Sequence, residues 1–478
     1  MSGFDQMNLL ECNPYHGCDL GDKRLTRRAA SIAECLSVKY GQPLSMVFKS
    51  ASDLKRAYEF LANPKTNFEK LIEPHSQQTV KEISGLPVVL AVGDTTYLDY
   101  KKIVAKREDY GPIGNGGNGL ILHTTLAVDP DFGQPLGLLW EKLWHREKPS
   151  RLQDGETAQQ KKQRLKQEQQ LKRKRSIEEK ESYRWVEAFQ QVDEHFLQKE
   201  TSLKGRPKVI HVFDREGDIS EVFEQACQIK NTGVVVRAAH NRNLQGSNQH
   251  LWEYVAAQRV QFVLEVTLPE TKKRSARIAT LEVRFCRVKL QFPSRLKNGD
   301  DFKVYAVYAQ EINPPEQEEP VEWMLLTTES VTTHQEAAQI LRWYTYRWRV
   351  EEYHKILKSG CKAESYRLGG ESMATLLGFL TVIASHLLRI TYLHRNSPDS
   401  PAVLVLTPVQ IDVLLALTPA QLKNSGNLTI DWALGAIARL GGYLEHRRKT
   451  AIGIQVLWRG WLQLESLCLG WQLHQNPN

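Results

Sequence analysis

The stretch "LPVVLAVGDTTYLDY", residues 86–100, decides the fold. Its apolar, β-branched run is typical of a buried strand, and the run ends at Asp94, where a polar turn follows. The same pattern returns in "PKVIHVFDREGDI", residues 207–219, where the apolar run ends on Asp214. Open α/β sheets bind ligands outside the carboxyl ends of their strands. We therefore expect a sheet with two functional aspartates at one edge, although aspartate is also common in ordinary turns.

Neighbouring segments extend this sheet. Residues 119–128 and 134–140 predict two more strands, joined by the turn "DPDFG", and residues 232–240 predict a fifth strand after a helix. Three strands followed by strand–helix–strand units favour an α/β fold in which helices flank a mixed sheet. Residues 244–325 alternate between apolar and polar side chains, which predicts an inserted β subdomain.

The two ends of the chain are predicted to be helical. Apolar residues recur at helical spacing from Leu25 to Leu36, after Asp22, which would be the N-cap. A second helix is expected to begin near Ser52 or Asp53. The last hundred or so residues also carry apolar stripes, which would pack on their own domain or form an oligomer interface. The expected domains are residues 1–70 (helical), 71–370 (α/β) and 371–478 (helical).

Composition sets the broad class of the protein. The 478 residues are 41% hydrophobic and 25% charged, which is typical of a soluble globular protein with two to four domains. The net charge of +8 permits an anionic partner, and seven cysteines without a CxxC pair favour a reducing compartment. The most apolar run, residues 373–390, contains His386 and Arg389, which favours a buried helix over a membrane span. We expect a cytoplasmic protein without a membrane role, which would associate with the nucleoid if its anionic partner is DNA.

Basic residues gather at the starts of the N-terminal helices. Positive charge there opposes the helix macrodipole, so helix stability does not explain it, whereas contacts to phosphates would. A solvated basic face is the alternative. A second charged segment, residues 155–185, predicts an exposed helix or a partly disordered excursion. The N-terminal residues expected to bind DNA are Arg24, Arg27, Arg28, Lys55 and Arg56.

The stretch "YTYRWRVEEYHKILKSG", residues 344–360, predicts one helix that is packed along an aromatic stripe and presents a polar ridge on another face. A salt-bridge ladder from Arg347 to Lys355 on a solvated helix would explain part of that ridge. It does not explain why Tyr344 and Lys358 continue the same line. The ridge comprises Tyr344, Arg347, Glu351, Lys355 and Lys358.

Glu351 is the third candidate acid. Together with Asp94 and Asp214 it would supply hard oxygen ligands, which select Mg²⁺ or Mn²⁺. Two such ions can activate an attacking oxygen and stabilise the leaving one in phosphodiester transfer. We therefore expect two Mg²⁺ ions, replaceable by Mn²⁺, beside a row of Arg and Lys side chains that binds the phosphate backbone.

These motifs resemble those of a known family. The ridge has the spacing Y-x2-R-x3-E-x6-K, and "GDTT" at Asp94 and "DREGD" at Asp214 accompany it. In these features the chain is similar to the bacterial cut-and-paste transposases of the insertion-sequence-four family. The likeness extends from about Leu20 to about Leu464 and includes "LGDKRLTRR", "AYEFLANP" and "NPPEQEEPVEWMLLT".

The resemblance implies a ribonuclease-H-like catalytic core with an inserted β subdomain. The N-terminal domain would bind the transposon ends, and the C-terminal domain would support a homodimer in the synaptic complex. Asp94, Asp214 and Glu351 would be the catalytic, metal-binding acids. Trp323 would stack on a flipped base, and Arg237 would lie near the active site. The implied contacts to end DNA are Tyr344, Arg347, Lys355 and Lys358.

The implied reaction is cut and paste. Water would cut one strand at the terminal inverted repeat of double-stranded DNA, and the freed 3′-hydroxyl would attack the opposite strand to give a hairpin. Hydrolysis of the hairpin and joining to target DNA would follow.

Two alternatives stay open. One is a non-catalytic inhibitory or regulatory DNA-binding derivative, against which the intact acids argue. The other is a metal-dependent nuclease of the same fold that only hydrolyses, which would need neither Trp323 nor a dimer region.

Overall fold

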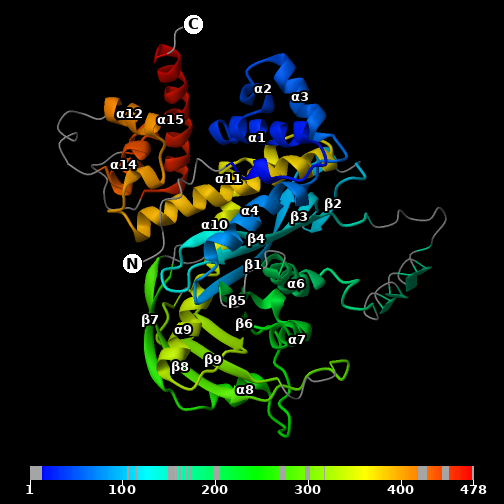
Figure 1. The fold of residues 1–478 in the computed structure, drawn as a ribbon. Coiled ribbons are helices and arrows are strands. Elements are labelled where there is room, and N and C mark those ends of the chain that lie inside the picture. The colour runs from blue at the N-terminus through cyan, green and yellow to red at the C-terminus, as the bar shows by residue number, and fades with distance from the viewer. Residues whose placement is uncertain are drawn as a thin grey trace.

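The computed structural model describes residues 13–475 except 105–106, 115, 149–156, 158, 161–162, 165, 168–169, 172–174, 198–204, 269–275, 297–301, 317, 418–427 and 444–451. A mixed sheet of ten strands runs through this described part of the chain (Figure 1). Its order is β2-β3-β1-β5-β6-β10-β9-β8-β7, and β4 also pairs with β3. The strands are β1 (Val88–Asp99), β2 (Gly111–Gly114), β3 (Gly117–Val128), β4 (Pro135–Trp144), β5 (Lys208–Phe213), β6 (Thr232–Arg237), β7 (Phe262–Leu268), β8 (Arg277–Val288), β9 (Val304–Glu311) and β10 (Glu322–Thr327).

Helices flank the sheet, and the helices from the two ends of the chain lie together at one end of the molecule (Figure 1). Helix α11 contacts β4 and α4 of the central domain and also α1 and α3 of the N-terminal region. Helix α6 contacts β4, and α7 contacts β6. The larger helices are α1 (Lys23–Val38), α3 (Ala51–Leu61), α4 (Phe68–Ile83), α6 (Tyr183–Leu197), α7 (Ser220–Gln228), α9 (His334–Thr345), α10 (Trp348–Lys355), α11 (Gly370–Asn396), α12 (Pro408–Leu417), α14 (Ile430–Leu440) and α15 (Ile454–Gln475). The short ones are α2 (Leu44–Val47) and α8 (Leu251–Ala256).

Strand β1 separates two hydrophobic cores. Leu90 and Val92 belong to the larger core, which also contains residues of α9, α10 and α11. Val89 and Ala91 belong to another core, with residues of α4 and α6. Because successive side chains of a strand point to opposite faces, Asp94 shares the face of Val92 and lies toward α10.

The predicted strands are confirmed, with one correction to the first. The five apolar runs form β1, β3, β4, β5 and β6. Asp94, however, does not end its strand, because β1 continues to Asp99 in antiparallel pairing with β3. Only the parallel pairing with β5 stops earlier, at Val92. The acid therefore lies where β1 loses its neighbour on one side.

The strands expected in the inserted β subdomain are also present, but they do not form a separate sheet. Strands β7, β8, β9 and β10 are consecutive antiparallel neighbours, and β10 pairs with β6 of the central sheet. The insertion therefore extends the core sheet through the pairing of β10 with β6.

The helical ends largely follow the sequence pattern. Asp22 is the N-cap of α1 and accepts a hydrogen bond from the Arg24 backbone N–H. Helix α3 begins earlier than predicted, because Ser50 caps it through the backbone N–H of Asp53. Helix α11 is long and apolar enough to cross a membrane, but 78% of its most apolar window is buried inside the protein. This agrees with the buried helix predicted for residues 373–390.

Candidate active site

Asp94 and Asp214 lie on the same face of the sheet. The parallel pairing of β1 and β5 reaches Val92 and Val212, and each aspartate follows two residues later. Asp214 lies just beyond β5 and caps a short 3-10 turn, where it accepts a hydrogen bond from the Glu216 backbone N–H at 2.9 Å. The first two predicted acids are therefore at the same level of adjacent chains.

Arg347 connects Glu351 to this pair. Its Nη2 donates to Glu351 Oε1 at 2.5 Å, and its Nη1 lies 3.8 Å from Asp94 Oδ2. The Arg347 side chain is only 13% exposed, and its Nε has no hydrogen-bond partner among the described residues. The contact with Glu351 is also the first step of the salt-bridge ladder considered above. The contact with Asp94 shows that this arginine does more than stabilise its own helix.

The charges at this point influence one another. Burial raises the pKa of Asp94 to about 7, and Arg347 opposes that rise. The charges of Asp214 and Glu351 add to it. For Arg347, burial acts to lower the pKa, but the charges of Tyr344, Glu351 and Asp94 and the hydrogen bond to Glu351 together raise it. Neighbouring carboxylates disfavour each other's ionised forms, and a cation between them removes that penalty.

The three acids suit a divalent cation by their chemistry, because they offer hard oxygen donors in a partly buried place. Their present geometry is not that of a closed metal site. Among the described residues, no three His, Cys, Asp or Glu side chains are close enough together to hold an ion. The guanidinium of Arg347 provides the positive charge between Asp94 and Glu351. The chemical type of these ligands therefore suits a divalent cation, whereas their present spacing does not form a complete site.

The single helix predicted over residues 344–360 is wrong. Helix α9 ends at Thr345, α10 begins at Trp348, and a π-helix follows over Ile356–Gly360. The polar ridge is therefore divided among three elements.

The break between α9 and α10 is held by the turn that joins β3 to β4. The Tyr346 hydroxyl donates to the carbonyl of Asp131 at 2.9 Å. Arg349 Nε donates to the carbonyl of Gly133, also at 2.9 Å. Any Cβ at Gly133 would lie 2.6 Å from the Tyr346 ring, so the turn approaches the break closely only because this residue is glycine. A tertiary contact thus overrides the local helical pattern.

The remaining ridge residues differ in their surroundings. Tyr344 is buried on α9, whereas Glu351 and Lys355 are exposed on α10. Lys358 lies in the π-helix, 4.0 Å from a carboxylate oxygen of Glu364. Burial lowers the pKa of Lys358, although the charge of Glu364 opposes this. The structure therefore brings Arg347 and Glu351 to the aspartates but gives Tyr344 and Lys358 different environments.

Trp323 and Tyr344 pack edge to face. Each is 6% exposed, and their ring centroids are 5.5 Å apart at an interplanar angle of 68°. Arg237, at the end of β6, donates from Nη2 to the Glu322 carbonyl at 2.9 Å. Trp323 is thus part of the core here. Its stacking on a base stays a prediction, and it requires the indole to leave Tyr344.

The N-terminal basic residues lie on α1 and α3, on the far side of α11 from the sheet (Figure 1). Arg24 and Arg27 are exposed, and Arg28 is half-buried. Lys55 and Arg56 are exposed, and the carboxylates in their ion pairs are 4.0 Å away. Surface pairs of this kind contribute little, so these cations can bind an anionic partner.

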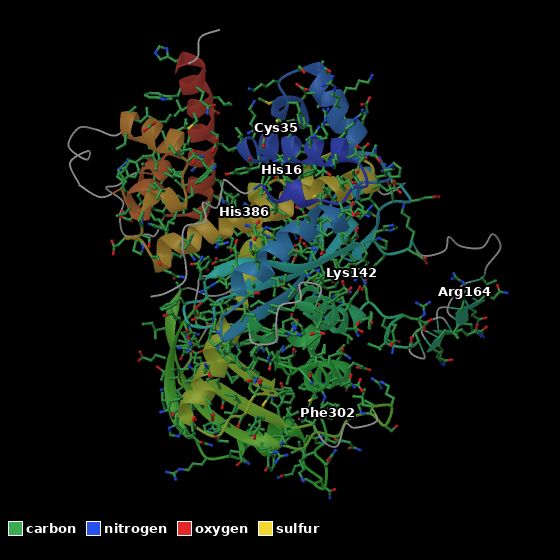
Figure 2. All side chains as sticks on the ribbon, in the orientation of Figure 1. His16, Cys35, Lys142, Arg164, Phe302 and His386 are labelled. Carbon is green, nitrogen blue, oxygen red and sulfur yellow. The ribbon has the colours of Figure 1, made fainter. Side chains whose placement is uncertain are left out.

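The charged segment at 155–185 lies only partly within the described residues. Figure 2 shows Arg164 in this segment, away from the sheet. Near the end of the segment, Glu181 accepts hydrogen bonds from Arg146 at 2.7 and 2.8 Å. Helix α6 begins two residues later, and Arg184 in its first turn donates a hydrogen bond to Thr95, next to Asp94.

Three residues beside the aspartates were not predicted. A Cβ at Gly93 would lie 2.6 Å from the Phe213 ring, so only glycine lets β1 pass so close to the residue before the second aspartate. The Thr95 backbone N–H donates to Asp94 Oδ1 at 2.8 Å, and the Thr95 hydroxyl accepts from Arg184 Nε at 2.8 Å. The "GDTT" motif contains the first two and could have indicated them. Arg184 belongs to the charged segment, where no pattern distinguishes it.

One comparison with known proteins bears on the N-terminal helices. Residues 13–66 match a family model described as transposase DNA-binding. The match contains α1, α2 and α3 and all five N-terminal basic residues named above. It supports a DNA-binding transposase, with DNA as the partner of this chain.

Proposed function

We propose that the protein is a cut-and-paste DNA transposase, similar to the insertion-sequence-four family, whose active site is formed by Asp94, Asp214 and Glu351. The observation that carries this proposal is that the two aspartates occupy equivalent positions on adjacent parallel chains. Arg347 pairs with both Asp94 and Glu351 and so links the third acid to them. The match of residues 13–66 to a transposase DNA-binding model supplies the substrate class.

Each group then has a chemical role. Mg²⁺, when bound, supplies activation of the attacking oxygen and neutralisation of charge on the phosphodiester. Asp94, Asp214 and Glu351 are the residues that would hold it. Arg347, which now pairs with two of these acids, would be free to donate to a phosphate oxygen when they bind a cation. The exposed arginines of α1 hold the end DNA in place.

The course of the reaction is the finer part of the proposal. One strand is cut at the transposon end, a hairpin forms and is reopened, and the 3′ ends are joined to target DNA. Trp323 stabilises the hairpin step by stacking on a displaced base. Two copies of the chain act together through the C-terminal helices, because both ends must be joined to one target.

A regulatory derivative that binds DNA without cutting it remains the second candidate. One observation favours it: within the described residues, no three acidic or other metal-binding side chains are close enough to hold an ion. Such a protein would bind the transposon ends and leave both DNA strands intact.

The experiment that tests the proposal uses a labelled duplex with the terminal repeats of the element that encodes this chain. The duplex is incubated with full-length protein and Mg²⁺, and the products are separated on a denaturing gel, with Asp94→Ala as the control. We expect Mg²⁺-dependent nicks and hairpins at the end, which the control lacks. Retention of the duplex on a native gel without any cleavage would support the regulatory candidate instead.

A further inference from the structure

Arg184 lies in the first turn of α6, against the face of the sheet opposite Glu351. Its side chain is only 8% exposed, and all three guanidinium nitrogens donate hydrogen bonds. Nε donates to the Thr95 hydroxyl at 2.8 Å, and Nη2 donates to Glu216 Oε2 at 2.5 Å. Nη1 donates to the Glu181 carbonyl at 2.9 Å, which ties the guanidinium to the start of its own helix. Every nitrogen of the guanidinium therefore donates to an acceptor on another residue.

The two residues that Arg184 holds are also the ones that hold the aspartates. The Thr95 backbone N–H donates to Asp94 Oδ1 at 2.8 Å. The Glu216 backbone N–H donates to Asp214 Oδ1 at 2.9 Å. One guanidinium thus bridges the segment of β1 that contains the first aspartate and the turn after β5 that contains the second.

The direction of the hydrogen bonds makes this bridge specific. A guanidinium only donates, so the Thr95 oxygen accepts from Arg184 and its own proton is available to His123 Nδ1, 2.9 Å away. A neutral imidazole can accept this proton at Nδ1. Burial, together with the charge of Arg184, holds the pKa of His123 well below its usual value, which agrees with this assignment. The Thr95 hydroxyl is fixed from both sides.

We infer that Arg184 is a positioning residue that fixes the separation at which Asp94 and Asp214 take up a divalent cation. The inference rests on the proposed metal site. Partners of metal-binding carboxylates orient them, and their loss typically weakens metal affinity about 10- to 100-fold. A lysine at this place would keep the positive charge but could not reach Thr95 and Glu216 along two fixed directions, because it lacks the planar fork.

A purely structural role for Arg184 makes a different prediction, and the chain offers a matched control. Arg206 is equally buried, with a side chain 7% exposed, and it pairs with Asp193 near the other end of α6. It also lies over the Phe196 ring, 5.2 Å from the ring centroid. Neither contact involves an aspartate of the candidate site. Loss of Arg206 should therefore lower stability without changing the affinity for a cation.

The experiment measures Mn²⁺ binding to full-length protein by the electron paramagnetic resonance signal of the free ion, with thermal unfolding in EDTA measured in parallel. The variants are Arg184→Lys, Arg206→Lys and Thr95→Val, which removes only the hydroxyl that Arg184 holds. We expect Arg184→Lys and Thr95→Val to weaken Mn²⁺ binding about 10-fold or more, whereas Arg206→Lys binds as the wild type does. Thr95→Val provides the test if Arg184→Lys does not fold.

Three results would overturn the inference: unchanged Mn²⁺ affinity in a folded Arg184→Lys or Thr95→Val, an equal loss in Arg206→Lys, or no Mn²⁺ binding by the wild type. The proposed function is tested separately by cleavage of the end duplex. Weaker Mn²⁺ binding in the Arg184→Lys protein, alongside a wild type that does not cut DNA, would remove the transposase proposal and leave the role of Arg184 standing.

Discussion

Asp94 and Asp214 occupy equivalent positions on two adjacent parallel chains, because each lies two residues beyond Val92 and Val212, the last pair between β1 and β5. Helix α10 packs on the same face of the sheet. Arg347 contacts both Glu351 on that helix and Asp94, and so links the third acid to the first. Three carboxylates from distant parts of the sequence and one buried guanidinium thus form a single electrostatic unit. Its present cation is an arginine, and the chemistry proposed above requires a metal ion beside the same acids.

Gly93 should be intolerant of any side chain. A Cβ there would lie 2.6 Å from Phe213 Cε1 and 2.9 Å from its Cδ1, within a packed core. We expect Gly93→Ala to lower the free energy of unfolding by about 1–3 kcal/mol, as overpacking does. Gly435→Ala on α14 is the control, because nothing lies within 4 Å of its added Cβ. Its free energy of unfolding should rise by about 0.5–1 kcal/mol. Urea unfolding measures both, and equal effects would contradict the packing argument.

Glu141 should make stability depend on pH. It is fully buried, accepts hydrogen bonds from Thr124 and Tyr353 at 2.8 Å, and burial raises its pKa to about 7. The folded protein therefore keeps a proton that the unfolded chain releases above its ordinary pKa of 4.5. The free energy of unfolding therefore falls by about 3 kcal/mol in total as the pH rises from 4.5 to about 7.

Glu141→Gln cannot ionise and should escape this loss. Its stability relative to the wild type should therefore increase between about pH 5 and about pH 8, as measured by urea unfolding at both values. A stability difference that stays constant with pH would show that Glu141 does not titrate in this range.

Arg27 tests the N-terminal contribution to DNA binding. It is exposed on α1 within the range that matches the transposase DNA-binding model. We expect Arg27→Ala to weaken binding of the end duplex and to reduce the slope of log K against log salt by about 1, as the loss of one phosphate contact does. Lys230→Ala is the matched control, an exposed lysine between α7 and β6 outside that range. Equal effects of the two variants would indicate binding by net charge alone.

Trp323 tests the hairpin step. Trp323→Ala removes a buried ring that packs on Tyr344, so it should cost about 3–5 kcal/mol of stability and must be assayed well below its unfolding temperature. We expect it to nick the first strand but to give a lower ratio of hairpin to nicked product. Trp323→Phe keeps an aromatic face and should retain part of that ratio. If the ratio in the Ala variant equals that of the wild type, Trp323 belongs to the core alone.

Much of the fold could be predicted because its signals are local. Apolar β-branched runs gave β1, β3, β4, β5 and β6, and Asp22 marked the start of α1. The break between α9 and α10 could not be predicted, because it contains neither glycine nor proline. The contacts of Tyr346 and Arg349 with the β3–β4 turn stabilise it, and they depend on the folded sheet.

The candidate site divides in the same way. The aspartates could be identified because each follows an apolar run, and the parallel pairing of β1 and β5 brings the two positions together. Arg184 could not, since about 90 residues separate it from Thr95 and its charged neighbourhood suggested a solvated segment. Only burial and hydrogen-bond direction distinguish it from the other basic residues of that segment that the structure describes.

The central claim is that Asp94, Asp214 and Glu351 act as one site. The most direct test is single-turnover cleavage of the end duplex in Mg²⁺ by Asp94→Asn, Asp214→Asn, Glu351→Gln and their pairwise combinations, with duplex binding measured alongside. The account predicts that every variant still binds the end, that each single change lowers cleavage about 1,000-fold or more, and that a second change adds little, because groups that act as a unit are not additive. Cleavage at the wild-type rate by any one of the three variants would contradict it.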